Sequence, residues 1–394
     1  MVSSTIDHMV ATVVFLGALL LFVGLFNQTI QTAILYQRHR HLATKCSDLL
    51  DNVLLNPGDW SGSIPTSFGL QDPEFQQYRL SPFSLMRLLS SAGDKVYYNR
   101  TGEWYSNVSW GLGGGYMLLP ESECINYSTA SKLLGTNGTC GFQLTISPTL
   151  TVNVREVQLK PLVLEVQIMG PGLALSGANL NYLMFSTGKD GCISDNTTAD
   201  SLGLASLTFP EINVNNNQTA YTFIVRAHVS GLYGIGYASR ETTTKAGNII
   251  PFIENYANGT ILLAHKWGKN DPGEECQGAL HFNATFYLLP DNFAPIKVAD
   301  YTGLVNYGNG TSFERIQIPT SNPGFLVVAY RKGNEYGMVV MPWGIGIIGV
   351  SVVFGGNPSG NEWVATDMRQ VLVGDVAYQA KLALWSLEGY GVIG

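Results

Sequence analysis

The chain has 394 residues, of which 13% are charged and 11% aromatic, and its formal net charge is −7. This length exceeds what one ordinary hydrophobic core organises, so we expect two or three domains. The few Lys and Arg residues are dispersed and form no basic stripe that could neutralise a phosphate backbone, which argues against nucleic acid as a partner.

An uncharged apolar segment lies near the N-terminus. As a helix rising about 1.5 Å per residue, Met9–Phe26 nearly crosses a hydrocarbon core of about 30 Å. A cleaved secretory signal is the alternative interpretation. The residues before the segment contain no Lys or Arg, however, and no small-residue cleavage site follows Phe26. We therefore expect a helix that is retained and can span a membrane.

The same helix is predicted to continue far beyond the apolar segment. Asn27 to Leu55 contains no Gly or Pro, and Asn56-Pro57-Gly58 is a helix-stopping signal, so Ser4 to Leu55 would form one rod of about 75 Å. Its second half carries a single apolar face. This face can pack against copies of the chain or against the chain's own β domain, through Leu35, Leu42, Leu49 and Leu50.

The stretch Ser4-Thr5-Ile6-Asp7-His8-Met9-Val10 places an acidic residue at the head of a long apolar helix that turns amphipathic. In this respect residues 1 to 55 resemble type IV pilins and pseudopilins, of the kind found in archaeal-type surface proteins. The resemblance implies a helix that first sits in the membrane and later packs with its neighbours in a filament core. Asp7 would be the family's fifth residue if Met1 and Val2 were removed, although no Lys/Arg-Gly processing signal precedes the helix.

Two roles are open for Asp7. A carboxylate at a helix N-terminus is favoured by the unsatisfied backbone amides there, so Asp7 can act as a cap. In an apolar filament core it would instead need a cationic partner, such as the α-amino group of a neighbouring copy, because an unpaired buried charge is costly.

Asn-X-Ser/Thr sequons occur throughout the region that follows the apolar segment, although some such triplets arise by chance. Arg38, Arg40 and Lys45 lie on the same side, which the positive-inside tendency would place in the cytoplasm. Long domains translocate largely regardless of flanking charge, so we expect the sequon-bearing side to be outside and glycosylated. The sequons begin at Asn27, Asn99, Asn107, Asn126, Asn137, Asn196, Asn217, Asn258, Asn283 and Asn309.

The five cysteines show no C-x-x-C motif and no grouping with His at metal-binding spacing, so neither a metal site nor a redox site is predicted. Cys124 and Cys140 flank a sequon-bearing loop and form the first predicted disulfide. Cys192 and Cys276 form the second. Cys46 lies on the long helix, where we expect a packed thiol with no disulfide partner.

The remainder of the chain is predicted to be mainly β, so the fold class is one long N-terminal helix followed by two or three sandwich-like domains. The predicted divisions are the helix at 1–56, an irregular β-rich region at 57–155, an Ig-like sandwich at 156–245 and a C-terminal β domain at 246–394. The sandwich is predicted from strands with turns between them at Leu162–Ile168, Leu180–Phe185, Leu204–Phe209, Tyr221–His228 and Leu232–Tyr237. Together with its turn glycines, this alternation resembles surface Ig-like domains.

Two C-terminal segments leave alternatives open. Gly337–Phe354 is uncharged and long enough to span a bilayer, but Pro342-Trp343-Gly344 divides it and β-branched residues flank the division, which favours two buried strands. Gly374-Asp375 fits a tight hairpin turn that closes a pair of strands near Met368 to Trp385. A helix over Val376–Leu387 is the alternative there.

No nucleophile, acid–base pair or metal-ligand motif is present, so no cofactor and no catalytic role is expected. The leading hypothesis is a structural subunit of an extracellular pilus-like filament. Its helix would pack in the core through Asp7 and the four leucines, and its glycosylated β domains would lie outside. Its partners would be copies of itself, the membrane before assembly, and other surface proteins or glycans. The alternative is an anchored cell-surface glycoprotein acting as a stalk or adhesin; a binding protein for a small ligand or sugar rests only on the many Tyr and Trp residues.

Overall fold

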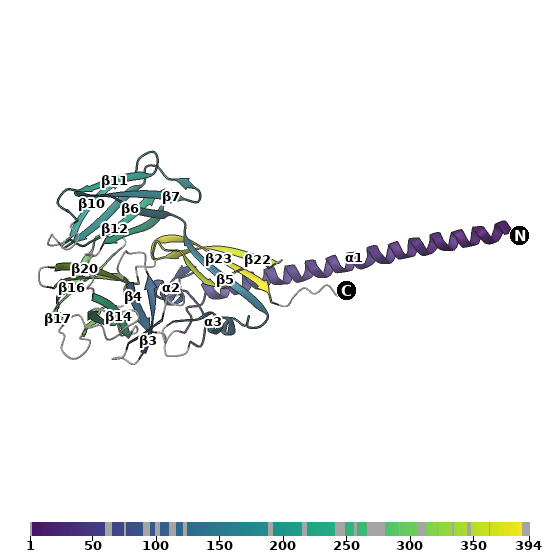
Figure 1. Cartoon of the computed structure of the whole chain (residues 1–394), viewed down its shortest axis with the longest axis horizontal. Helices are drawn as coiled ribbons and strands as arrows, with labels where there is room; N and C mark the ends of the chain where they lie inside the picture. The colour runs from purple at the N-terminus through teal and green to yellow at the C-terminus, as the bar shows by residue number, and fades with distance from the viewer. Residues whose placement is uncertain are drawn as a thin grey trace.

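The computed structural model describes residues 2–59, 65–74, 76–89, 95–98, 103–109, 116–120, 124–187, 192–214, 219–240, 249–255, 258–265, 280–290, 292–305, 313–320, 322–332, 335–344, 348–361 and 363–387. One long helix projects from a body made mostly of β-strands (Figure 1). The fold is therefore mainly β with a single long N-terminal helix, as the sequence predicts.

Helix α1 spans Val2–Leu54 and is continuous. It ends where Asn56-Pro57-Gly58 stops it, with Gly58 at a φ of 72° that residues with a Cβ rarely adopt. Two short helices lie in the body, α2 at Pro82–Leu89 and α3 at Tyr127–Leu133. Both lie in the region 57–155, which was predicted to be irregular and β-rich.

The sheet nearest the helix has five strands in the order β1-β22-β23-β5-β21. Its centre is the hairpin of β22 and β23, in which Val373 pairs with Val376 across the two-residue turn Gly374-Asp375. Gly374 has a φ of 63°, which suits a two-residue hairpin turn. The predicted turn is confirmed and the alternative helix over Val376–Leu387 is wrong. The strands are β1 Arg79–Leu80, β5 Cys140–Pro148, β21 Val352–Gly355, β22 Val364–Val373 and β23 Val376–Ser386.

The β-sandwich consists of two antiparallel sheets, in the orders β11-β7-β6 and β10-β9-β12-β13, with β8 beside β7. Alternate residues of β7 are buried between the sheets, and the rings of Tyr182, Phe209 and Phe223 pack against one another there. All five strands predicted for this region are present. The strands are β6 Thr151–Leu159, β7 Leu162–Gly170, β8 Leu173–Ala174, β9 Asn179–Ser186, β10 Cys192–Thr198, β11 Leu204–Phe209, β12 Tyr221–Val229 and β13 Leu232–Arg240.

Two further sheets complete the body, one in the order β18-β15-β14-β4-β3-β2 and the other in the order β17-β16-β19-β20. The six-stranded sheet contains β2 Lys95–Tyr98, β3 Glu103–Ser109, β4 Tyr116–Pro120, β14 Ile249–Asn255, β15 Thr260–His265 and β18 Phe313–Gln317. The four-stranded sheet contains β16 Leu280–Leu288, β17 Ile296–Val305, β19 Gly324–Lys332 and β20 Glu335–Trp343.

The predicted domain divisions need correction. The division at residue 155 falls inside β6, which begins at Thr151. The regions 57–155 and 246–394 are also not separate units, because β4 pairs with β14 and β5 pairs with β23. These pairings join segments that lie more than a hundred residues apart, so no local sequence signal reveals them. The sandwich is inserted between the two halves of one interleaved body.

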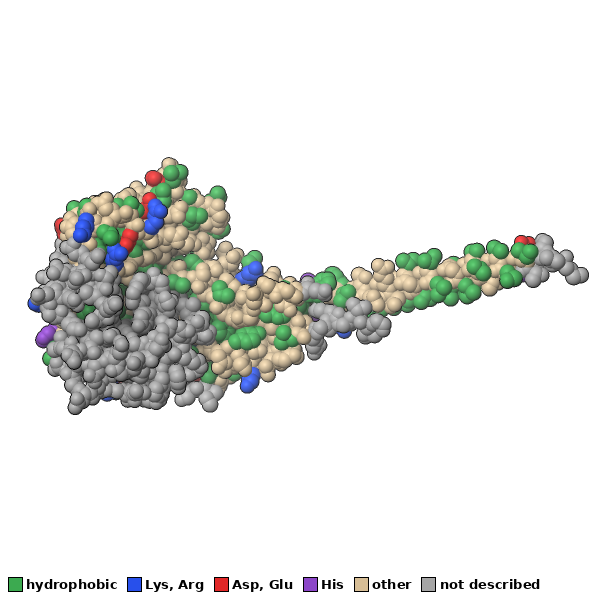
Figure 2. All heavy atoms as spheres, viewed as in Figure 1, with side chains coloured by type: hydrophobic (Ala, Val, Ile, Leu, Met, Phe, Trp, Pro, Cys, Tyr) green, Lys and Arg blue, Asp and Glu red, His purple; other side chains and the backbone are tan. Residues whose placement is uncertain are grey.

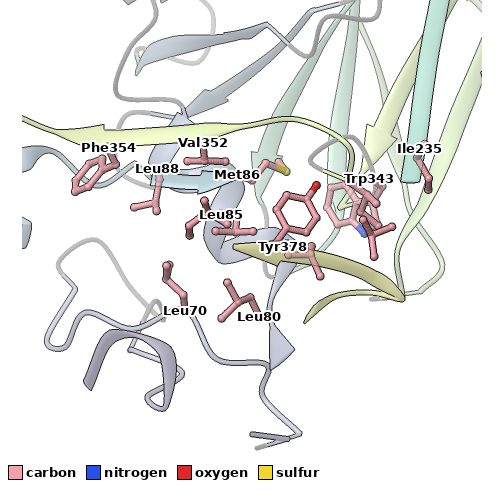
Figure 3. Close-up of a cluster of buried hydrophobic side chains, with 14 of the residues drawn as sticks. Leu70, Leu80, Leu85, Met86, Leu88, Ile235, Trp343, Val352, Phe354 and Tyr378 are labelled. Carbon is pink, nitrogen blue, oxygen red and sulfur yellow. The ribbon is translucent and has the colours of Figure 1, made fainter. Parts of the chain in front are cut away.

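A single hydrophobic core unites the interleaved body. Leu85, Met86 and Leu88 of α2 belong to one cluster of buried side chains together with Val352 and Phe354 of β21 (Figure 3). The same cluster includes Leu70 and Leu80 from the segment after α1, Tyr378 of β23 and Trp343 of β20. Segments from both ends of the chain are therefore required before this core can close.

The uncharged segment Gly337–Phe354 contributes strands to two different sheets, β20 and β21, as favoured over a membrane helix. Met338 to Met341 are buried in the core. Pro342 lies within β20 and not in the dividing turn. It is tolerated there because β20 is an edge strand and does not need every backbone N–H. The bend follows at Gly344, whose φ is 72°.

Candidate functional site: the exposed helix and its dock

The part of α1 from Ile6 to Arg38 is exposed along its whole length. Hydrophobic side chains cover it on all sides, because consecutive residues such as Leu19 to Phe22 point in directions about 100° apart. Figure 2 shows this shaft projecting from the body with its hydrophobic side chains uncovered. The segment is long and apolar enough to cross a membrane, with a mean hydropathy of 2.7 in its most apolar window.

The shaft is longer than a membrane core requires. Beyond Phe26, the twelve residues Asn27–Arg38 add about 18 Å of exposed helix before the body begins. This outer part is mixed in character. It carries Gln and Thr residues together with the exposed apolar side chains Ile30, Ile34, Leu35 and Tyr36.

The last quarter of α1 is packed against the chain's own hairpin of β22 and β23, and we call this contact the dock. Its apolar face is buried through Leu42, Cys46, Leu50, Val53 and Leu54. The filament hypothesis assigns Leu42, Leu49 and Leu50 to packing between subunits, with packing on the chain's own β domain as the alternative. This assignment is corrected for Leu42 and Leu50, which are 5% and 0% exposed within one chain, and Leu49 is packed against the same core. Leu35 is 37% exposed and remains available to another surface.

An ionic cluster holds the dock at its edge. The guanidinium of Arg369 in β22 donates to both carboxylate oxygens of Asp51, at 3.0 and 3.1 Å, and to the Ser47 hydroxyl at 3.0 Å. It also lies 2.8 Å from the Asp367 carboxylate. Burial alone raises the pKa of Asp367, but hydrogen bonds from Ser47, the Met368 amide and Arg369 lower it on balance. Two strand residues therefore fix the rotation of the helix on the sheet.

Cys46 lies at the centre of the dock, where its sulfur is 3.4 Å from the Leu382 carbonyl oxygen and 3.6 Å from that of Ala365. Burial and then the nearby Asp367 charge raise the pKa of the thiol to about 11. The thiol has no disulfide partner and is completely buried, which confirms the prediction for this residue.

The predicted disulfides are not formed. Cys140 and Cys192 both carry free thiols, so neither Cys124–Cys140 nor Cys192–Cys276 is linked, and Cys276 lies outside the described residues. Cys140 begins β5 with its sulfur 3.6 Å from the Lys45 ammonium of α1. Burial raises the pKa of Cys192 to about 11. Proximity in sequence indicated the first pair, but the fold turns Cys140 towards the long helix.

Asp7 is exposed and lies in the second turn of α1, because the helix begins at Val2. Its carboxylate therefore does not cap the helix, and the predicted capping role is wrong. In the part of the chain that the structure describes, no three or more His, Cys, Asp or Glu side chains gather as a metal site.

Five predicted glycosylation sites lie at exposed positions: Asn126, Asn137, Asn196, Asn258 and Asn283. The sequon at Asn27 lies on the exposed shaft of α1. Asn126 has a structural role, since its side-chain oxygen accepts from the Thr129 amide and caps α3. Asn107 is in β3, but its side chain is not described, and Asn99, Asn217 and Asn309 fall outside the described residues. Glycosylation itself stays a prediction.

No protein-family model matches the sequence, and no curated protein matches it either. Two solved structures of fibronectin type III domains resemble parts of the chain. A two-domain segment from chicken tenascin is 9% identical with a TM-score of 0.17, covering 52% of this chain and 97% of that segment. Domains FN1–FN3 of chicken CNTN1 are 9% identical with a TM-score of 0.16, covering 50% and 65%. Likenesses this low carry no argument about function.

Proposed function

We propose that this chain is a cell-surface protein anchored by α1, and that it serves as the structural subunit of an extracellular pilus-like filament. The shaft of α1 is embedded in the membrane before assembly and packs against the shafts of other copies afterwards. The β body, attached through the dock, forms the outer surface. The resemblance of residues 1 to 55 to type IV pilins supports the same assignment.

The observation that carries the proposal is the uncovered shaft. Fourteen large hydrophobic side chains between Ile6 and Phe26 are exposed. Burying such a set is worth on the order of 20 kcal/mol, so the shaft requires either lipid or other apolar helices around it. Because the apolar residues lie on every side, several neighbours are needed to cover them, as in a bilayer or in a bundle of copies.

The segment Asn27–Arg38 favours the filament over a simple anchor. In an anchor standing in a bilayer, this part of the helix lies beyond the hydrocarbon core, and Ile30 and Ile34 face water or head groups. These two residues are one helical turn apart on one side, so they can contact a neighbouring shaft together. A filament covers them and an isolated anchor does not.

The alternative is an anchored glycoprotein that acts as a stalk or adhesin. It is favoured by the dock itself, because Leu42 and Leu50 are satisfied within one chain and need no second copy. In both functions the role is structural or adhesive and not catalytic, with the sequon-bearing body outside the cell.

The test uses the paired substitution Ile30→Gln and Ile34→Gln in the full chain, with Leu173→Gln and Leu202→Gln as the control. The control residues are exposed leucines on the sandwich, at 71% and 64%. We expect the shaft variant to remain in the membrane fraction but to disappear from sheared surface filaments seen by electron microscopy and identified by mass spectrometry, while the control assembles. Absence of the unaltered chain from filaments would establish the anchored alternative.

A further inference from the structure

One face of the sandwich sheet β10-β9-β12-β13 changes character along its strands. The pairing places residues of the four strands in rows, with Leu183 beside Ile224 in one row and Asn181 beside Arg226 in the next. Leu183, Ile224 and Ile235 belong to the core of the interleaved body, so this end of the face is the sandwich's attachment to the body. The other end is polar and opens into a groove.

The groove has a volume of about 450 Å³, within the range of protein sites for small ligands. Its walls are rich in amides, hydroxyls and rings, and no Asp or Glu among the described residues lines it. Eight wall residues come from the sandwich strands, among them Asn179, Asn181, Asn196, Thr198 and His228, and Asn292 comes from a loop of the body. Uncharged donors and acceptors of this kind suit a ligand rich in hydroxyl groups.

Arg226 forms the inner end of the groove and is 7% exposed. Its Nη2 pairs with Asp375 in the hairpin turn, and its guanidinium lies 4.1 Å from the centre of the Tyr233 ring, which stacks on His228. Its Nε–H has no hydrogen-bond partner within the described residues. A buried donor without a partner favours an acceptor from a bound molecule.

We propose that the N-linked glycan on Asn196 folds into this groove, where its first sugars are bound by the sandwich and by Asn292 of the body. This inference rests on the extracellular, glycosylated placement in the proposed function. Asn196, Thr197 and Thr198, which form the sequon, all line the groove. Asn196 is exposed on β10, an edge strand, so its amide is accessible to modification.

Covalent attachment makes weak contacts effective. A sugar linked to the Asn196 side chain is held at the wall of the groove, so its binding is intramolecular and takes place at a high effective concentration. The sugar hydroxyls can bond to the amides of Asn179 and Asn181, and a sugar oxygen can accept from Arg226. Because Asn292 belongs to the body and the other groups to the sandwich, the bound glycan bridges the two.

The experiment measures how strongly the native fold protects each glycan from limiting periodate, which cleaves vicinal diols of accessible sugars. Full-length glycosylated protein is oxidised in mild detergent, and the glycopeptides are then resolved by mass spectrometry. Asn137 is the reference, since it is exposed in a turn and is not among the residues that line this groove. We expect the Asn196 glycan to be oxidised at least fivefold more slowly than the Asn137 glycan, and at the same rate after unfolding.

Two variants test whether the groove causes the protection. Asn181→Ala with His228→Ala leaves the sequon intact and should bring oxidation of the Asn196 glycan up to the Asn137 rate. The control Asn153→Ala, an exposed asparagine on β6, should leave protection unchanged.

Equal oxidation of the two glycans in the native protein would overturn the inference while leaving the proposed function intact. An unmodified Asn196 beside a glycosylated Asn137 would do the same. Absence of glycan at every sequon would contradict both the inference and the glycosylated surface in the proposed function. Filament assembly is measured separately, so its failure is distinguishable from either result.

Discussion

Arg369 of β22 makes the main polar contact between the body and α1. Its planar guanidinium binds both oxygens of Asp51, a geometry that a Lys ammonium cannot reproduce. The pair is only partly buried, with side-chain exposures of 26% and 36%, so solvent weakens it relative to a buried pair. Its main effect is to set orientation, and its contribution to stability is secondary.

Replacing Arg369 with Ala should lower the free energy of unfolding by about 1–2 kcal/mol, because Asp51 and Asp367 lose their shared cation. Arg155→Ala is the matched control, since Arg155 pairs with Glu165 but is 73% exposed. Urea unfolding of both variants in detergent checks this. Equal midpoints for the two variants would show that Arg369 contributes no more than an exposed pair.

The pH dependence of the dock follows from Asp367. Its pKa is lower in the folded chain than the ordinary value of about 3.9, so its contribution to stability is fully present above that value. The contribution is lost as the pH falls through the lowered folded pKa. We expect Asp367→Asn to flatten the fall in unfolding free energy below about pH 4, measured by urea titrations at several pH values. An unchanged acid profile would contradict this role.

At the scale of elements, α1 is one helix with two environments. Its last quarter is stabilised by the dock, whereas its shaft is exposed along its length and depends on its surroundings. Intrinsic helix propensity alone rarely stabilises an isolated helix in water, so lipid or neighbouring copies must stabilise the shaft. The same chain segment thus joins a folded body to an external apolar environment.

Leu50→Ala and Leu35→Ala separate these environments with the same chemical change. Leu50 is completely buried, so its truncation should lower the unfolding free energy by about 2–4 kcal/mol. Leu35 is partly exposed, so its truncation should change stability little and reduce filament yield instead. Urea unfolding and the yield of sheared filaments are the two measurements. Strong destabilisation by Leu35→Ala would mean that the shaft packs on the body.

At the scale of the whole molecule, the C-terminal hairpin connects the three parts. Arg369 of β22 binds Asp51 of α1, and the Leu382 carbonyl of β23 contacts Cys46 of α1. In addition, β23 pairs with β5 of the body, and Asp375 in the hairpin turn pairs with Arg226 of the sandwich. The sandwich is therefore positioned relative to the helix by residues close to the end of the chain. Its orientation on a filament surface would depend on this hairpin.

The contact between the hairpin turn and the sandwich is tested by Asp375→Ala. Removing this carboxylate leaves the buried Arg226 charge without its partner, which should lower the unfolding free energy by about 2–3 kcal/mol. The double variant Arg226→Met with Asp375→Ala removes both charges and should be less destabilised than Asp375→Ala alone. Urea unfolding of both variants checks the order. The reverse order would show that Arg226 contributes mainly through packing on Tyr233.

Local patterns explain the predictions that the structure confirms. The absence of Gly and Pro from Asn27 to Leu55 indicated an uninterrupted helix, and Gly374-Asp375 between two apolar strands indicated the hairpin. Strand alternation and turn glycines located the sandwich strands. Each of these signals involves residues within a few positions of one another, which is the range over which sequence periodicity and turn chemistry act.

The sequence by itself determined the long helix, its apolar shaft, the mainly β class and the positions of the sequons. Only the tertiary structure decided that Leu42 and Leu50 pack within one chain, that residues 57–155 and 246–394 interleave, and that Cys140 faces Lys45. Arg369 and Asp51 are 318 residues apart, and no local signal links them. The physical reason is that strand pairing and helix docking depend on complementary surfaces brought together by the whole chain, whereas propensity and periodicity are properties of short segments.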